Sequence, residues 1–251
     1  MTLFRRWGLA LLALLAACSS DGPSRAEENA KASDVFTRKG VRYMEDGRLD
    51  LALQDFERAL DFDSGNSEAH NAMAVLQERL NKPDEARKHY KRAVSLNEAN
   101  YAAVNNYSKF LCLHGEQEEG VQLLLGVLNS NLYGHPWVAQ TNLGICYKTA
   151  GRMAEAEQAF RQAIDQQPAF SPALLEMAQV SFASQDYMKA RAFLQRYTVG
   201  TPHNAETLWL AVRIEEALGN ERSRHDYLQQ LHSRFPNAPE TDLSRQQFPG
   251  K

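Results

Sequence analysis

Cysteine, long apolar stretches and catalytic signatures are all scarce in this chain. Only three of its 251 residues are cysteine. The motifs HExxH, CxxC and GxSxG and a glycine-rich phosphate loop are absent, and the seven histidines are scattered. These absences argue against a familiar metal site, phosphate site or activated nucleophile. We therefore expect a protein that is not an enzyme and uses no cofactor and no small-molecule substrate.

A concentrated basic segment is also missing. The formal net charge is −3, and removal of Arg5 and Arg6 with an N-terminal targeting segment would make it more negative. The basic cluster of residues 87–92 shares its predicted helix with Asp84 and Glu85, which is typical of a solvated helix face. Nucleic acid is therefore not an expected partner.

What the chain does contain is a repeated pattern of small and aromatic residues, clearest between Trp137 and Pro168. Small side chains permit helices to cross closely, and aromatic side chains fill the space beside each crossing. Gly151 is placed to end the first of two helices, because glycine readily adopts the left-handed conformation found there. The small residues of this segment are Gly144, Ala156 and Ala163, and the aromatic residues are Tyr147 and Phe160.

The turn position recurs six times along the chain, with separations of 34, 34, 36, 34 and 34 residues. A period of 34 residues with this pattern resembles the tetratricopeptide repeat, and no sustained alternation indicates a strand. We therefore predict an all-α superhelical solenoid of six helix-pair repeats at 33–238, followed by a tail at 239–251. The six turn residues are Gly47, Asn81, Gly115, Gly151, Gln185 and Gly219.

Two repeats depart from the pattern. In repeat three, Gly120 and Val127 replace the expected alanines, and a two-residue insertion near Tyr133 and Gly134 follows. We expect altered helix contacts there. In repeat six, Arg224 stands where a buried alanine is expected, and a polar residue suits a terminal repeat that has no neighbour beyond it.

The first seventeen residues have the pattern of an export signal: two arginines, an apolar run from Leu9 to Leu15, and small residues before Cys18. The run is shorter than the roughly 20 residues that span a bilayer. Leu-Ala-Ala-Cys resembles a bacterial lipobox, which implies lipid attachment at Cys18; the alternative is an ordinary signal peptide. No aspartate follows the cysteine, which in such lipoproteins favours the outer membrane. The polar segment 18–32 is expected to be a flexible tether.

Cys112 and Cys146 lie 34 residues apart, on the first helices of repeats three and four. Neighbouring first helices run in the same direction, so the two sulfur atoms are expected within about one turn of each other along the axes. We predict a disulfide, and the alternative is a pair of separate buried thiols. By loop entropy the bond would contribute roughly 3 to 4 kcal/mol to stability.

In tetratricopeptide arrays the first helices line a concave groove, mainly through positions 2, 5, 9, 12 and 13. Apolar patches are expected at both ends of this groove, with polar residues between them, and such a surface suits an extended or helical peptide. The alternative is that the preceding repeat covers some of these residues. The predicted partner-binding residues are Val41, Met44, Val75, Asn105, Lys109, Phe182 and Trp209; Thr37, Asn71 and Ala102 occupy equivalent positions.

The chain has a lipobox, a short polar tether and six repeats, in that order, and the run Val104-Asn105-Asn106-Tyr107 before Phe110-Leu111. In these features it resembles the PilF/PilW-type lipoproteins of type IV pilus biogenesis. This resemblance implies an outer-membrane pilotin, lipid-anchored with its repeats facing the periplasm. Its partner would be the secretin, the ring through which the pilus emerges, whose localisation or multimer assembly it would promote. A scaffold lipoprotein of another envelope machine, for outer-membrane protein insertion or cell-wall synthesis, is the alternative.

Overall fold

The structure is a computed structural model that describes residues 23–249. Within this range the chain forms thirteen α-helices and no strand, which confirms the predicted fold class. The helices are α1 (Arg25–Glu45), α2 (Leu49–Phe62), α3 (Ser67–Arg79), α4 (Pro83–Leu96), α5 (Tyr101–Leu113), α6 (Gln117–Leu128), α7 (Pro136–Thr149), α8 (Met153–Gln166), α9 (Ser171–Ala183), α10 (Tyr187–Gly200), α11 (Ala205–Ala217), α12 (Glu221–Arg234) and α13 (Pro239–Gln247).

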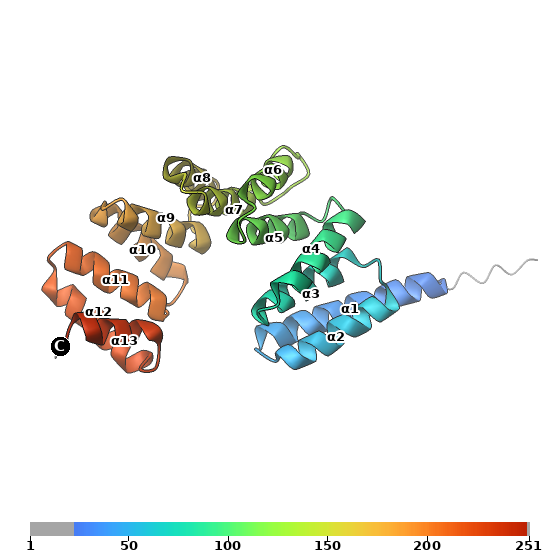
Figure 1. The fold of residues 1–251 in the computed structure, drawn as a ribbon, viewed down its shortest axis with the longest axis horizontal. Helices are drawn as coiled ribbons and strands as arrows, with labels where there is room; N and C mark the ends of the chain where they lie inside the picture. The colour runs from blue at the N-terminus through green and yellow to red at the C-terminus, as the bar shows by residue number, and fades with distance from the viewer. Residues whose placement is uncertain (1–22, 250–251) are drawn as a thin grey trace, which may run out of the picture.

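The first twelve helices form six consecutive pairs, α1 with α2 through α11 with α12. The pairs follow one another along an arc, with α1 at one end and α13 at the other (Figure 1). Each odd-numbered helix also contacts the next odd-numbered helix as far as α9, and α11 contacts α13. Among the helices of residues 23–249, none has the length and apolar character that crossing a bilayer requires.

Each pair turns at a residue with positive φ. The six residues are those predicted from the period: Gly47, Gly115, Gly151 and Gly219 with φ between 68° and 90°, Asn81 with 56° and Gln185 with 62°. Glycine adopts this conformation freely and asparagine tolerates it, whereas glutamine pays a steric cost. The repeat register predicted from the sequence is therefore confirmed.

Small residues at the helix crossings explain how closely the pairs pack. A Cβ atom added to Gly144 would lie 2.4 Å from the Phe160 ring, and one added to Gly40 would lie 2.5 Å from Phe56. Both rings are completely buried. The glycine and the aromatic residue of a repeat thus form one packing unit in the first and fourth repeats.

The predicted disulfide is present between Cys112 on α5 and Cys146 on α7, with a Cα–Cα distance of 4.9 Å. It also explains why repeat three has Gly120 where alanine is usual. A Cβ atom at Gly120 would lie 2.4 Å from the Cys112 sulfur and 2.7 Å from the Ser108 carbonyl oxygen. The sulfur atom occupies the space that the alanine methyl group fills in other repeats.

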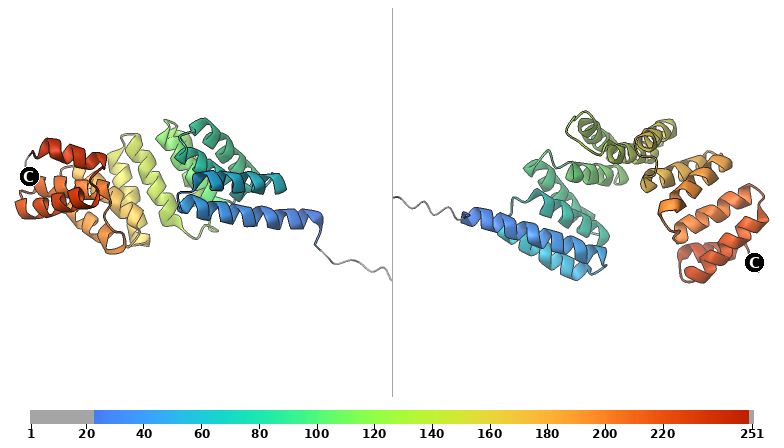
Figure 2. Two further views of the ribbon diagram at one scale, coloured as in Figure 1. Left: turned by 90° about the horizontal axis from the view of Figure 1, so that it is seen from below. Right: turned by 180° about the vertical axis from the view of Figure 1, so that it is seen from behind.

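Helix α1 begins at Arg25, inside the segment for which we predicted a flexible tether, so the prediction is wrong for residues 25–32. The Ser24 hydroxyl accepts from the Glu27 backbone amide, and the Glu27 carboxylate accepts from the Ser24 amide. This capping box starts the helix early, and alanine, glutamate and lysine continue it. Helix α1 consequently extends past its partner α2 (Figure 2).

The segment expected to be a tail contains helix α13, which packs against α11 and α12. Phe248, just after α13, is buried beside Val212 and Leu228. Arg224 is also buried, with 8% of its surface exposed, because its guanidinium pairs with Glu216 and lies 5.2 Å from the Phe248 ring centroid. The expectation of a solvent-facing polar cap at Arg224 is therefore wrong, and α13 covers the end of the array instead.

Candidate peptide-binding groove

The first helices of repeats one to three enclose an open groove with a volume of about 450 Å³. Helices α1, α3 and α5 all contribute to it, as expected for the concave side of a repeat array. Four positions predicted to line this surface do so: Thr37, Val41, Asn71 and, on α5, Ala102. The remaining lining residues are Arg38, Arg42, Glu45, Glu68, Ala72 and Asn100.

The groove is hollow because its floor is built from small side chains. Ala72 is almost fully buried, and Thr37 turns its hydroxyl back to donate to the Ser33 carbonyl oxygen at 2.9 Å. Because its hydroxyl is engaged in that bond, Thr37 contributes its methyl group to the floor of the groove. Val41 is half-buried and is the largest aliphatic side chain in the lining. The centre of the groove can therefore receive an apolar side chain from a partner.

Charged side chains form the rim. Arg38, Arg42, Glu45 and Glu68 are all exposed. Within residues 23–249, none of the four makes a salt bridge or a side-chain hydrogen bond with another residue. Two cations and two carboxylates are thus free to pair with a ligand of mixed charge.

Two residues predicted to bind a partner do not line the groove. Met44 has only 6% of its surface exposed and packs with Phe56, Met73 and Leu76 between the first two repeats. Val75 is half-buried against the same cluster and does not line the groove. Met44 is therefore a core residue, and the prediction that a partner contacts it is wrong for this conformation. Its position near the end of α1 faces repeat two, which covers it.

Asn105 is also buried, with 2% exposed, because the inserted segment between α6 and α7 folds over it. Its amide donates to the Tyr101 carbonyl oxygen at 2.7 Å and to the Tyr133 hydroxyl at 3.0 Å. The Tyr133 ring packs on Tyr101, with centroids 5.1 Å apart. The prediction of Asn105 as an exposed contact residue is thus wrong. Lys109 is exposed on α5, outside the groove lining.

Further along the array, polar side chains of successive first helices bond to one another. Asn106 donates to Asn71 at 3.1 Å, and Asn142 donates to the Asn105 carbonyl oxygen at 3.3 Å. These groups have partners within the protein, so a ligand gains little from replacing them. The series continues from α7 through α9 to α11, with Lys148 paired to Glu176 and Gln179, and Gln179 donating to Glu206.

The predicted apolar patch at the far end is partly covered. Trp209 lies edge-on to Phe248, with ring centroids 6.4 Å apart, so the segment after α13 occupies one side of it. Phe182 is half-buried, with the Arg213 guanidinium 4.4 Å from its ring centroid. Trp209 and Phe182 are therefore each partly covered, and their contact with a partner stays a prediction.

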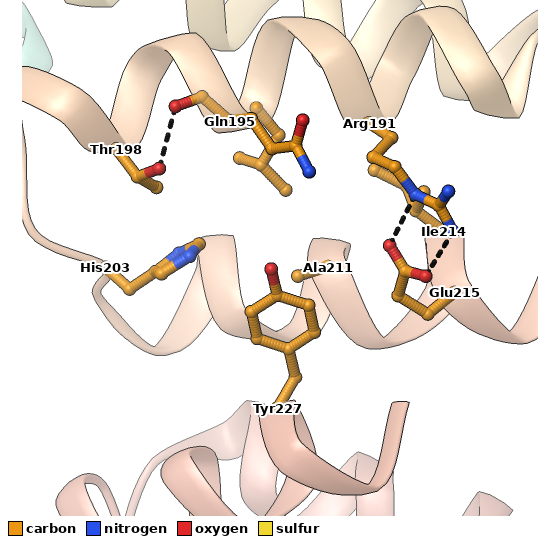
Figure 3. Close-up of a pocket in the computed structure, with 9 residues that line it drawn as sticks. Arg191, Gln195, Thr198, His203, Ala211, Ile214, Glu215 and Tyr227 are labelled. Carbon is orange, nitrogen blue, oxygen red and sulfur yellow. Dashed lines mark hydrogen bonds and ion pairs between the residues drawn. The ribbon is translucent and has the colours of Figure 1, made fainter. Parts of the chain in front are cut away.

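A second cavity, between α10, α11 and α12, is too small for a ligand. Its volume is about 10 Å³, which suits one water molecule. Arg191 and Glu215 form a two-point ion pair at one side, and His203 and Tyr227 lie at the other (Figure 3). Burial, followed by the charge of Arg234, lowers the pKa of His203. This cavity is part of the packing between repeats five and six.

Some lining residues were not predicted, and the sequence carried a signal for them. Arg38 lies three residues before Val41, Glu45 lies four after Val41, and Arg42 lies four after Arg38, so these spacings place all three along the side of α1 that carries Val41. Cys18, the predicted lipid-attachment residue, lies outside the described residues. In the range 23–249, no cluster of three or more histidine, cysteine, aspartate or glutamate residues is placed to hold a metal ion.

Comparisons with known proteins agree with this architecture. A family model described as a tetratricopeptide repeat matches residues 43–93 and 148–206. The type IV pilus assembly protein PilF of Pseudomonas aeruginosa is 26% identical over 210 residues, which cover 84% of this chain and 83% of the relative.

Two solved structures resemble the whole array. The crystal structure of PilW, described as a widely conserved type IV pilus biogenesis factor, is 28% identical with a TM-score of 0.72 and covers 84% of this chain and 97% of PilW. The structure of PilF of Pseudomonas aeruginosa is 25% identical with a TM-score of 0.69 and covers 88% of this chain and 99% of PilF. At 26–28% identity over most of its length, the chain is homologous to the tetratricopeptide-repeat proteins PilF and PilW.

Proposed function

We propose that this chain is a type IV pilus assembly factor that acts as a non-catalytic adaptor, and that its N-terminal groove binds a segment of the secretin. The homology to PilF and PilW over most of the chain is the observation that carries the pilus role. Secretin subunits are the proposed partner because they form the outer-membrane ring of the pilus machine. The adaptor would hold such subunits together or at the membrane while multimers assemble.

The form of the groove supports a peptide ligand. It is open and built from three parallel first helices, with small side chains at its floor and charged side chains at its rim. A peptide can insert one apolar side chain and pair its charges with the rim, whereas a small molecule would usually be enclosed more completely. Beyond α3, Asn106 and Asn142 already donate hydrogen bonds to groups of the protein. The N-terminal end is therefore the part of the concave face best suited to a partner.

The groove lies in the repeats nearest the proposed anchor. We propose that Cys18 carries acyl chains that hold the protein at the outer membrane, with the repeats in the periplasm. An adaptor attached in this way would present α1, α3 and α5 to a partner that assembles at the same membrane.

Lipidation has a direct test. Cells that produce the full-length protein should incorporate labelled fatty acid into it, and the Cys18→Ser variant should incorporate none. The repeats of the variant should remain folded, since the described helices begin at Arg25; circular dichroism checks this. Equal labelling of both proteins would exclude Cys18 as the attachment site.

The adaptor role can be tested in cells with single substitutions. Val41→Asp places a carboxylate in the apolar floor, so heat-resistant secretin multimers should decrease. Gln54→Asp is a matched control, because Gln54 is exposed on α2 of the same repeat and lies outside the groove. Normal multimers with a folded Val41→Asp protein would argue against secretin binding in this groove. Loss of another envelope assembly, with multimers unchanged, would favour the alternative scaffold function.

A further inference from the structure

Two histidines meet side by side in repeat two, away from the groove lining. His70 on α3 and His89 on α4 are each half-buried, and their Nδ1 atoms are 3.0 Å apart. The ring centroids are 5.2 Å apart and the planes are inclined by 37°. Nitrogen atoms at this distance share either a proton or a metal ion.

The protonation of His70 is determined by its other nitrogen. Its Nε2 atom lies 3.2 Å from the carbonyl oxygen of Ser64, which can only accept a hydrogen bond. Nε2 therefore carries the proton, and the Nδ1 atom of the neutral ring presents a lone pair toward His89. A backbone carbonyl that orients one nitrogen while the other binds is the usual arrangement around a metal-bound histidine.

The separation of the two nitrogen atoms favours one class of ion. With metal–nitrogen bonds of about 2.0–2.1 Å, nitrogen atoms 3.0 Å apart subtend an angle of about 90° at the metal. A tetrahedral ion such as Zn²⁺ would hold them about 3.3 Å apart. Right angles between neighbouring nitrogen ligands are typical of tetragonal Cu²⁺, which also binds imidazole most strongly among the common divalent metals.

We propose that His70 and His89 form a binding site for Cu²⁺, with the two Nδ1 atoms as neighbouring ligands and water in the other positions. Burial lowers the pKa of each ring. Binding moves the Nδ1 proton of His89 to its Nε2 atom, so the histidines release no net proton. The ion would link α3 to α4 in a repeat whose α3 lines the groove.

The surrounding charges are balanced. Asp63 and Glu85 are the acidic groups whose charges act on the pair, and Arg92 and Lys88 are the basic groups. Glu85 is engaged with Lys88 at 2.7 Å. In the range 23–249, no third histidine, cysteine, aspartate or glutamate is placed to join the two imidazoles as a metal ligand. The protein would therefore supply two ligands, His70 and His89.

Electron paramagnetic resonance of the full-length protein with one equivalent of Cu²⁺ tests the proposal. Spin-echo modulation from the unaltered protein should show two coordinated imidazoles, and zinc should compete poorly. His70→Gln and His89→Gln should each weaken Cu²⁺ binding by about tenfold or more. His225→Gln, which changes an exposed histidine of α12, should leave the affinity unchanged.

Two results would overturn this site. The first is a spectrum from the unaltered protein that shows one imidazole or none, which does not depend on the folding of any variant. The second is unchanged Cu²⁺ affinity in folded His70→Gln and His89→Gln proteins, which would assign the copper to other histidines.

Discussion

At the residue scale, a single close contact can require a residue that the repeat pattern disfavours. Gly120 stands at an alanine position because the sulfur of Cys112 and the Ser108 carbonyl oxygen occupy the space of its missing side chain. Glycine is otherwise unfavourable inside a helix such as α6. Gly120 on α6 therefore leaves space for the disulfide-bonded Cys112 sulfur on α5, so the two helices can approach closely.

Gly120→Ala should lower the free energy of unfolding by about 1–3 kcal/mol, because the added methyl group must displace backbone or sulfur atoms. Gly126→Ala is the matched control on the same helix, where nothing lies within 4 Å of a new Cβ atom. It should be neutral or stabilise the protein by about 0.5–1 kcal/mol. Urea denaturation of both variants measures the difference, and equal stabilities would refute the packing account.

At Gln185, in contrast to Gly120, we expect a substitution to increase the stability of the protein. It has a φ of 62° at the turn between α9 and α10, a conformation that costs glutamine more than glycine. Gln185→Gly should therefore raise the free energy of unfolding by roughly 0.5–1 kcal/mol, and Gly151→Gln should lower it by a similar amount. Thermal or urea unfolding checks both, and destabilisation by Gln185→Gly would show that its side chain matters more than its backbone.

The repeat period predicts the turn residues and the side of each helix that faces the groove, since both follow from local geometry. It does not predict which of those positions a neighbour covers. Met44 is covered by repeat two, Asn105 by Tyr133 of the inserted segment, and Trp209 by Phe248. These contacts join residues distant in sequence or outside the repeat pattern, so a single repeat contains no signal for them.

At the element scale, the two ends of the array are completed in different ways. A capping box extends α1 beyond its partner, and α13 takes the position of a seventh first helix against α11. Between these ends, the small cavity lies between α10, α11 and α12 and is lined in part by the His203 ring. The Tyr227 ring lies edge-on to it, at 5.7 Å between centroids (Figure 3).

The cavity should make the C-terminal repeats sensitive to acid. The lowered pKa of His203 means that the unfolded chain binds a proton more readily than the folded chain. Its contribution to stability is present above the unfolded pKa of about 6.5 and is lost as the pH falls below that value. His203→Gln should therefore reduce the loss of stability between neutral and mildly acidic pH.

Urea denaturation at both pH values measures this effect. His225→Gln serves as the control substitution, since His225 is exposed on α12 outside this cavity. A His203→Gln protein with the same pH dependence as the unaltered protein would rule out a contribution from this ring.

At the scale of the whole molecule, the arc divides into an open N-terminal groove and a concave face beyond it whose polar groups are paired with one another (Figure 1). The disulfide joins the first helices of repeats three and four, close to the boundary between these parts. We therefore assign partner binding to repeats one to three and support of the arc to the remaining repeats. Because α1, α3 and α5 all line the groove, their relative positions must be kept for binding.

The most direct test is the affinity of the purified protein for the purified periplasmic part of the secretin, measured by titration calorimetry. Val41→Asp should weaken binding by about 1–2 kcal/mol, which is roughly five- to thirtyfold in Kd, because an apolar contact is lost and a carboxylate enters the floor. Gln54→Asp should bind as the unaltered protein does. Equal Kd values for the unaltered protein and a folded Val41→Asp variant would contradict the assignment of this groove.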